Sequence, residues 1–303
     1  MVTRNRLKTL LYVSISALIL TALILLVDYT ELWSALTTGN VPLIAVTTLC
    51  LTTVLPMLLT LKWQQTLLVL GHQASLWSLL RLQLATFPIS KLSPGNVGDL
   101  MKAYYLRDEV AYQPHMGGIA FERLVDLVVI FSFATIGGLV AGHTLASLMG
   151  GSALIGLVLL MAGTHRFASQ STDHRLLKKV QRFLVVFSLF AKHPERLGYV
   201  VLCSLLAWTL IFTYIYTLFL AFDATVSWLT VITLQPIAIA GGLLPFTLAG
   251  IGTREAAMLF LYSPLLSEPV ILAVGIIYSV FSTVVLSLAG LPFLRGAFSN
   301  HSP

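Results

Sequence analysis

Long uncharged runs divide this chain into segments long enough to cross a membrane. A transmembrane helix needs about 20 apolar residues to cross a hydrocarbon core of roughly 30 Å. The run 127–165 is long enough for two crossings, with a break expected near Gly150-Gly151 and a first helix beginning near Gly117. The pattern predicts an all-α polytopic membrane protein with about six full transmembrane helices. The uncharged runs cover residues 9–27, 41–61, 127–165, 197–222, 224–253 and 269–294.

Two segments are apolar but contain residues that interrupt helices. The segment 75–106 contains Pro88, Pro94 and Gly95. The segment 227–263 contains Pro236, Pro245, Gly250 and Gly252. We expect each segment to form a broken helix. An ordinary tilted helix with a proline kink is the alternative interpretation.

The charges of the loops predict the orientation, because cytoplasmic loops carry an excess of Lys and Arg. Basic residues precede the first run and follow the second, and seven of the 18 in the chain fall between Arg166 and Arg196. We therefore expect a multi-pass protein of the cytoplasmic (inner) membrane with both termini in the cytoplasm. Four acids and no base occur in the proposed outer loops, at 28–40, 142–150, 222–226 and 264–268.

This orientation makes both broken segments re-entrant. Residues 75–106 must enter and leave from the cytoplasmic side, and residues 227–263 from the outer side. The two halves of the chain then form an inverted-topology repeat, which is typical of secondary transporters whose broken helices meet near the midplane. The expected single membrane domain, 1–303, consists of a first half 1–164, a cytoplasmic basic segment 165–196 and a second half 197–294.

Composition agrees with lipid as the main solvent. Hydrophobic residues make up 57% of the 303 residues and charged residues only 10%, against about 25% charged residues in soluble domains. The net charge of +6 is concentrated in one predicted cytoplasmic loop, so we expect no nucleic-acid partner. Cys50 and Cys203 lie inside apolar runs and predict no disulfide. The histidines lack the spacing of a metal site, and no metal or cofactor is expected.

The first break carries polar residues around a predicted helix start. Pro94 and Gly95 end one half-helix, and Gly98 allows close backbone approach. The free N–H groups and partial positive charge of a helix N-terminus favour anions. A solvated cytoplasmic turn is the alternative. We expect this break to bind an anionic group of a substrate through Lys91, Ser93, Asn96, Asp99 and Lys102.

The second break has the same arrangement before a charged helix start. Thr253 is the expected N-cap. An Arg at membrane depth costs at least ~2.5 kcal/mol, so Arg254 needs an acidic partner or an anionic ligand. We expect Arg254 and Glu255 to bind substrate, and a structural ion pair of Arg254 with Glu122 or Asp126 is the alternative. The residues that interrupt the backbone here are Pro245, Gly250 and Gly252.

A third group of charges lies on the helix predicted to begin near Gly117. Arg123 and Asp126 are three residues apart and can pair on one face. Glu122 and Asp126 are four apart, so Arg123 satisfies one carboxylate at best. We expect these three residues to form a coupling network, because ionisable groups within the membrane are functional by default. The candidate partners for the second carboxylate are Lys91, Lys102 and Arg254.

Residues 173–191 predict an amphipathic helix that anchors at the surface of anionic lipid. Its basic face contains Arg175, Lys178, Lys179 and Arg182. Its apolar face contains Leu176, Leu177, Phe183, Leu184 and Phe187.

At the three motifs above, the chain resembles the flippase-like integral membrane family named after the transmembrane domain of lysylphosphatidylglycerol synthases. In that family the membrane domain is thought to move a lipid between leaflets, and a soluble C-terminal domain carries out aminoacyl transfer. Because the chain ends at Pro303, the resemblance implies a stand-alone form that is not an enzyme. The matching residues are Pro94-Gly95-x-x-Gly98-Asp99-x-x-Lys102 with Ala103-Tyr104-Tyr105-Leu106, then Glu122-Arg123, and Gly250-x-Gly252-x-Arg254-Glu255.

The leading hypothesis is translocation of an anionic lipid, either a phospholipid or a polyprenyl-phosphate-linked carrier, between leaflets. The first break would bind the phosphate from the cytoplasmic side and Arg254 from the outer side. Proton coupling through Glu122 or Asp126 is compatible with any transport function. The alternatives are a gradient-coupled transporter of a small anion and a membrane-embedded lipid-phosphate transferase with Asp99 or Glu122 as base. The expected partners are anionic membrane lipids, and a homo-oligomer or pathway enzymes stay open.

Overall fold

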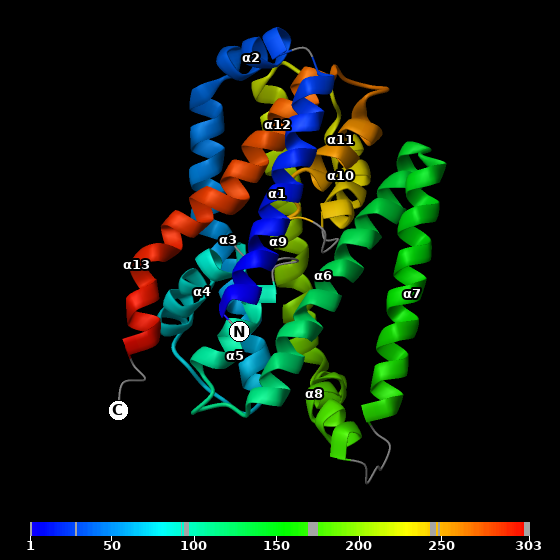
Figure 1. Ribbon diagram of the computed structural model, residues 1–303. Coiled ribbons are helices and arrows are strands. Elements are labelled where there is room, and N and C mark those ends of the chain that lie inside the picture. The colour runs from blue at the N-terminus through cyan, green and yellow to red at the C-terminus, as the bar shows by residue number, and fades with distance from the viewer. Residues whose placement is uncertain are drawn as a thin grey trace.

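The computed structural model describes residues 2–27, 29–91, 93, 97–168, 175–242, 247 and 249–299. All regular elements within these ranges are helices, and none is a strand (Figure 1). In chain order they are α1 (Val2–Leu26), α2 (Tyr29–Thr38), α3 (Val41–Val69), α4 (Leu76–Lys91), the 3₁₀-helix η1 (Val97–Leu100), α5 (Met101–Tyr105), α6 (Tyr112–Ala141), α7 (Thr144–Ala168), α8 (Arg175–Lys192), α9 (Pro194–Ala221), α10 (Trp228–Gly242), α11 (Thr253–Tyr262), α12 (Glu268–Val280), the π-helix η2 (Phe281–Val285) and α13 (Leu286–Ser299).

Five helices among the described residues are long and apolar enough to cross a membrane. They are Val41–Val69, Tyr112–Ala141, Thr144–Gly163, Pro194–Ala221 and the continuous run Glu268–Leu294. A sixth span is counted if the two helices Ser14–Leu26 and Thr30–Thr38, which are bent by 99°, are taken together. This confirms the predicted all-α polytopic fold with about six spans. The predicted outer loop 28–40 is wrong in one respect, because it contains α2.

Helix ends follow local capping chemistry. Asn40 caps α3, because its side-chain Oδ1 accepts a hydrogen bond of 3.1 Å from the Leu43 N–H. The Asn40 N–H also donates to the Ala221 carbonyl at 2.8 Å. This bond joins the beginning of α3 to the end of α9.

The break between α6 and α7 lies at Gly142 and not near Gly150-Gly151, so the predicted break is wrong. Gly142 has a φ of 72°, a left-handed conformation that glycine adopts without strain and that ends helices. Gly150 and Gly151 lie inside α7. A Cβ at Gly150 would lie 2.7 Å from Thr135 Oγ1, so this glycine allows close packing of α7 on α6. The first helix begins at Tyr112, before the predicted Gly117.

Both interrupted segments form short helices on either side of a break. The longest, α4, has 16 residues, which at 1.5 Å per residue is too short to cross a bilayer. Figure 1 shows α4 and α5 together in the lower half of the bundle, and α10 and α11 together in the upper half. The helices that flank the two predicted breaks therefore lie in opposite halves of the molecule. The inverted repeat, and which end faces the cytoplasm, stay predictions.

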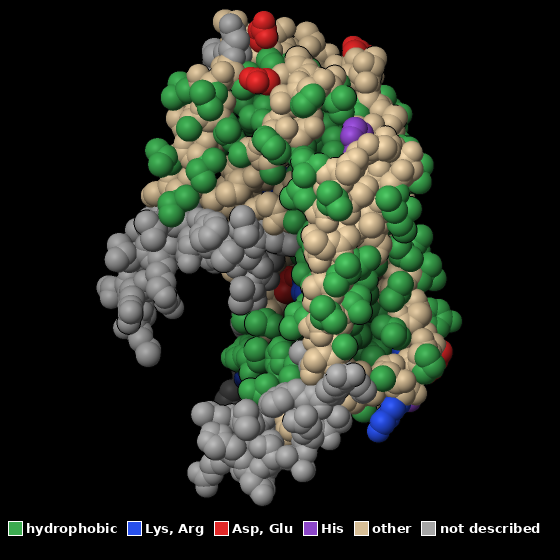
Figure 2. All heavy atoms as spheres, turned by 90° about the vertical axis from the view of Figure 1, so that its right-hand side faces the viewer, with side chains coloured by type: hydrophobic (Ala, Val, Ile, Leu, Met, Phe, Trp, Pro, Cys, Tyr) green, Lys and Arg blue, Asp and Glu red, His purple; other side chains and the backbone are tan. Residues whose placement is uncertain are grey.

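The outer surface is apolar, as a lipid-facing surface should be. Along α7, the side chains of Leu145, Leu148, Ile155 and Leu159 are all exposed. Figure 2 shows hydrophobic side chains over the face that α7 presents to the viewer.

The predicted amphipathic helix is present as α8, but its apolar face is in contact with protein. Phe187 and Phe190 are buried and pack against Phe121 of α6, with ring centroids 5.0 and 4.5 Å away. This corrects the expectation that the apolar face anchors in lipid. Arg182 is exposed, and the side chains of Arg175, Lys178 and Lys179 lie outside the described part of the chain.

Candidate functional site

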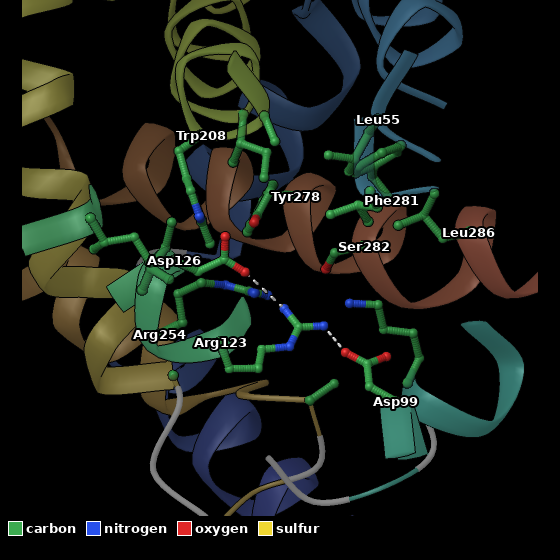
Figure 3. Close-up of a pocket in the computed structure, with 18 of the residues that line it drawn as sticks. Leu55, Asp99, Arg123, Asp126, Trp208, Arg254, Tyr278, Phe281, Ser282 and Leu286 are labelled. Carbon is green, nitrogen blue, oxygen red and sulfur yellow. Dashed lines mark hydrogen bonds and ion pairs between the residues drawn. The ribbon is translucent and has the colours of Figure 1, made fainter. Parts of the chain in front are cut away.

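A cavity of about 360 Å³ lies where the two breaks meet. The first break contributes Lys91 and Asp99, and the second contributes Ala249 and Arg254. α6 contributes Arg123 and Asp126 to the same wall (Figure 3). The two broken segments therefore share one site, although they are far apart in the sequence.

The opposite wall of the cavity is apolar. It consists of Leu55, Leu59, Phe87, Leu127, Ile130, Trp208, Ile211, Ile239, Phe281 and Leu286, with Tyr278 and Ser282 beside them. A charged wall facing an apolar wall suits an amphipathic ligand. Figure 2 shows a few charged side chains, in red and blue, in the interior of the molecule at mid-height.

Arg123 joins the first break to α6. Its guanidinium forms an ion pair with Asp99 and lies 3.5 Å from Oδ2 of Asp126. Figure 3 shows Arg123 between these two acids. The pairing of Arg123 with Asp126 was predicted from their spacing, whereas the contact with Asp99 was not. One cation is thus shared by two carboxylates on the cavity wall.

Asp126 is held by a residue that sequence reasoning missed. Lys62 Nζ donates to both carboxylate oxygens of Asp126, at 2.6 and 2.8 Å. Ser204 Oγ donates to Oδ1 of the same group at 2.8 Å. Lys62 and Asp126 are both buried. Of the predicted partners, Lys91, Lys102 and Arg254, none forms an ion pair with Asp126 in the described structure.

Lys62 was predicted to mark the end of a transmembrane run. The helix continues for seven residues beyond it, to Val69, so Lys62 lies inside the bundle. The only local signal was that Lys62 directly follows a run of 21 uncharged residues (41–61). That position is equally compatible with a lysine that extends to the membrane surface.

Glu122 and Lys102 lie behind the charged wall and do not line the cavity. Glu122 is 3% exposed and accepts a hydrogen bond of 2.6 Å from Thr66 Oγ1. Lys102 is also 3% exposed, and its ammonium lies 5.4 Å from the centroid of the Trp63 ring. Neither forms an ion pair with another described residue. Lys102, which was predicted to bind substrate, does not line this cavity.

At the second break, Arg254 and Glu255 form one buried cluster with α12. The Arg254 guanidinium lies 3.3 Å from Glu255 Oε1 and contacts Ser279 Oγ. Ser279 Oγ donates to Glu255 at 2.5 Å, and the ring of Tyr278 lies 4.4 Å from the guanidinium carbon. Arg254 therefore pairs with its neighbour, and the alternative of a pair with Glu122 or Asp126 is wrong.

Glu255 also organises the start of α11. Its Oε2 accepts a hydrogen bond of 2.6 Å from the Gly252 N–H, so Glu255 provides a hydrogen-bond partner for a backbone N–H at the start of the helix. Gly252 is the N-cap residue, with a φ of 91°, and the predicted N-cap, Thr253, is wrong. Glu255, which was predicted to bind substrate, is fully buried, does not line the cavity and forms an ion pair with Arg254, which does.

Ser93 organises the first break in a comparable way. Its hydroxyl donates to the Ser90 carbonyl at 2.6 Å and accepts from the Gly98 N–H at 2.7 Å. Ser93, which was predicted to bind substrate, does not line the cavity, and its hydroxyl forms these hydrogen bonds within the break. The predicted residues Pro94, Gly95, Asn96 and Pro245 lie outside the described residues.

Two glycines are required by close backbone approach, as predicted. A Cβ at Gly98 would lie 2.6 Å from the Ile89 carbonyl oxygen. A Cβ at Gly250, which has a φ of 77°, would lie 2.5 Å from the Gly242 carbonyl oxygen. Each break therefore folds back against the helix that precedes it.

The charged wall retains capacity for an anion. Three cations, Lys91, Arg123 and Arg254, face two acids, Asp99 and Asp126. Arg123 is already shared by both acids, whereas Lys91 pairs with no acid among the described residues. Nε of Arg254 is buried without a hydrogen-bond partner. Because a buried donor without a partner costs free energy, an anion that accepts a hydrogen bond from Nε of Arg254 would be stabilised here.

The sequence of the chain matches the family described as Lysylphosphatidylglycerol synthase TM region over residues 10–290. The match covers most of the chain, so this protein belongs to that family, which confirms the resemblance. Among curated proteins, none matches the chain. The family membership and the long apolar helices together identify a multi-pass membrane protein.

Proposed function

We propose that this member of the lysylphosphatidylglycerol synthase TM region family moves an anionic lipid between membrane leaflets and acts as a carrier, not as an enzyme. The observation that carries the proposal is the shared cavity, whose charged wall is built from both breaks and whose other wall is apolar. The lipid would be a phospholipid or a polyprenyl-phosphate-linked carrier. Both kinds of lipid contain a phosphate group, which suits the charged wall, and hydrocarbon, which suits the apolar wall.

The charged wall supports an anionic head group. Charge-assisted hydrogen bonds to phosphate are among the strongest polar contacts, and Lys91 and Nε of Arg254 have no partner within the described structure. These two groups belong to different breaks. A phosphate bound to both would link two segments that must move relative to each other during transport.

The apolar wall favours a lipid over a small soluble anion. Ten hydrophobic side chains, among them Phe87, Trp208 and Phe281, would remain in contact with water if the ligand were a small hydrophilic ion. Burial of apolar surface contributes about 25 cal/mol per Å², so a hydrocarbon chain along this wall adds affinity. The small-anion transporter is the second candidate, and the same cationic groups would serve it.

The ion pairs of Arg123 provide a switch for alternating access. Arg123 contacts Asp99 beside the first break and Asp126 on α6. A phosphate entering the cavity competes with Asp99 for Arg123, which releases the break from α6. This switch needs a side chain that can exchange partners, and Arg123 is about half exposed, at 46%.

A liposome assay tests the proposal. Purified protein is reconstituted in phosphatidylcholine vesicles with a trace of fluorescent phosphatidylglycerol, and dithionite bleaches the label in the outer leaflet. We expect complete bleaching with protein and about half without it. Losing one hydrogen bond to a charged group costs about 1.5–3 kcal/mol, so Lys91→Met should slow lipid movement roughly tenfold to hundredfold.

The matched control is Lys192→Met, because Lys192 is exposed at the end of α8. It should leave the rate unchanged. Equal rates for the native protein, Lys91→Met and Arg254→Ala would contradict the site. Uptake of radiolabelled phosphate without lipid movement would favour the small-anion transporter, and a new lipid product detected by mass spectrometry would favour the transferase.

A further inference from the structure

Two polar pairs connect α3 to α6, one at the cavity wall and one behind it. Lys62 and Thr66 are four residues apart on α3, and Asp126 and Glu122 are four apart on α6. Lys62 binds Asp126 at 2.6 Å, and Thr66 binds Glu122 at 2.6 Å. The helices run in opposite directions, so the two pairs form successive rungs of one ladder.

The two carboxylates of this ladder have different environments. Asp126 accepts hydrogen bonds from Lys62 and Ser204, and the guanidinium of Arg123 lies farther away, at 3.5 Å. Glu122 receives only the Thr66 hydroxyl. Because a buried carboxylate without a cation favours the protonated form, Asp126 is suited to a permanent negative charge and Glu122 to the gain and loss of a proton.

The groups around Glu122 determine what its ionisation would do. α3 presents Lys62 and Thr66, α5 presents Lys102, α9 presents Ser204 and Cys203, and α6 itself presents Asp126. The adjacent residue Phe121 packs against apolar side chains of α8, Phe187 and Phe190. Two buried ammonium groups, Lys62 and Lys102, therefore attract Glu122 once it is charged. Lys62 already forms an ion pair with Asp126.

Lys102 is followed by two further contacts on the side of the cavity wall away from the cavity, one with Trp63 and one between Trp63 and His115. Lys102 lies over the ring of Trp63, and the Trp63 indole N–H donates to His115 Nε2 at 2.9 Å. An indole N–H only donates, so His115 Nε2 accepts and the ring proton is on Nδ1. His115 Nδ1 is buried and has no partner among the described residues. Beyond it, near the surface, His72 lies 3.3 Å from the exposed Glu109.

We infer that Glu122 is the proton-binding group of this protein, with the Lys102 ammonium as a neighbouring cation, and that protonation of Glu122 couples lipid movement to a proton gradient. The inference rests on the proposed function and adds its energy source. When Glu122 loses its proton, it draws Lys62 away from Asp126. Asp126 then takes Arg123 from Asp99, and the first break is released from α6. Protonation reverses the exchange, and no covalent bond other than that to the proton changes.

A pH gradient across the same vesicles tests the inference. Phosphatidylcholine vesicles contain fluorescent phosphatidylglycerol and the full-length protein, and valinomycin with equal potassium on both sides removes the membrane potential. With one proton per lipid, a difference of one pH unit should give about a tenfold unequal distribution of the labelled lipid at steady state. Glu122→Gln cannot lose a proton at this position, so it should move little lipid and should not concentrate it, although it should remain folded because the amide oxygen of Gln can still accept the hydrogen bond from Thr66. Glu195→Gln, a substitution of an exposed carboxylate, should behave as the native protein does.

Three results separate the possibilities. An even distribution produced by the native protein overturns the coupling, whether or not the variant folds. An unequal distribution that persists in Glu122→Gln overturns the assignment of Glu122. No lipid movement by the native protein at any pH difference contradicts the proposed function itself, and the coupling with it.

Discussion

Substitution of Lys62 by Met tests whether the buried ion pair with Asp126 stabilises the fold. The lysine is 2% exposed and the aspartate 4%. Both are thus removed from solvent, and Met retains most of the volume of the lysine side chain. Removing one partner of a buried ion pair leaves an uncompensated charge and costs about 3–5 kcal/mol.

The structure places the expected cost at the lower end of this range. After the substitution, Asp126 keeps the 2.8 Å hydrogen bond from Ser204, and Arg123 remains 3.5 Å away. We therefore expect Lys62→Met to lower the free energy of unfolding by about 3 kcal/mol. Replacing both partners by apolar residues removes the unpaired charge. The double variant Lys62→Met with Asp126→Leu should therefore be more stable than the single variant.

Unfolding is followed by circular dichroism during titration of detergent micelles with sodium dodecyl sulfate. Lys192→Met is the matched control, and an exposed substitution of this kind is expected to change the free energy by less than about 0.5 kcal/mol. If Lys62→Met unfolds within about 1 kcal/mol of the native protein, or if the double variant is less stable than the single one, the pair does not have the role assigned to it.

Two further predictions concern the breaks. Gly98→Ala should destabilise the protein and abolish lipid movement, because the added Cβ would lie 2.6 Å from the Ile89 carbonyl oxygen. The control is Gly151→Ala, whose Cβ would meet only Thr135, at 3.8 Å. This control should leave lipid movement in the same vesicles intact. Arg254→Lys keeps the positive charge but loses the planar guanidinium that contacts Glu255, Ser279 and Tyr278. The rate of lipid movement should therefore fall at least tenfold. An unchanged rate would show that the positive charge alone is sufficient.

The spans and the two breaks could be predicted because they depend on local properties. The length of an uncharged run predicts whether a helix can cross the membrane, and Pro and Gly indicate where a helix ends. The importance of Arg254 was also visible, because an isolated charge in an apolar run needs a partner. The predicted break near Gly150-Gly151 failed because a glycine is compatible with both a helix interior and a helix end. Only the left-handed conformation of Gly142 distinguishes the two cases.

The internal pairing of the site could not be predicted. Lys62 and Asp126 are 64 residues apart in the sequence, and spacing along one helix gives no information on contacts between helices. Arg254 and Glu255 are adjacent, yet their pairing depends on Ser279 and Tyr278 of α12. Lys102 was placed with Lys91 because both flank the first break. The short helix α5 instead directs Lys102 towards Trp63, away from the cavity.

The most direct test of the account is a structure of the protein in nanodiscs that contain an anionic phospholipid. The account predicts density for a phosphate in the cavity between the two breaks, within about 4 Å of both Lys91 Nζ and Arg254 Nε. The hydrocarbon should lie along the wall formed by Phe87, Trp208 and Phe281. An empty cavity, with lipid head groups bound only at the outer surface of the bundle, would contradict it.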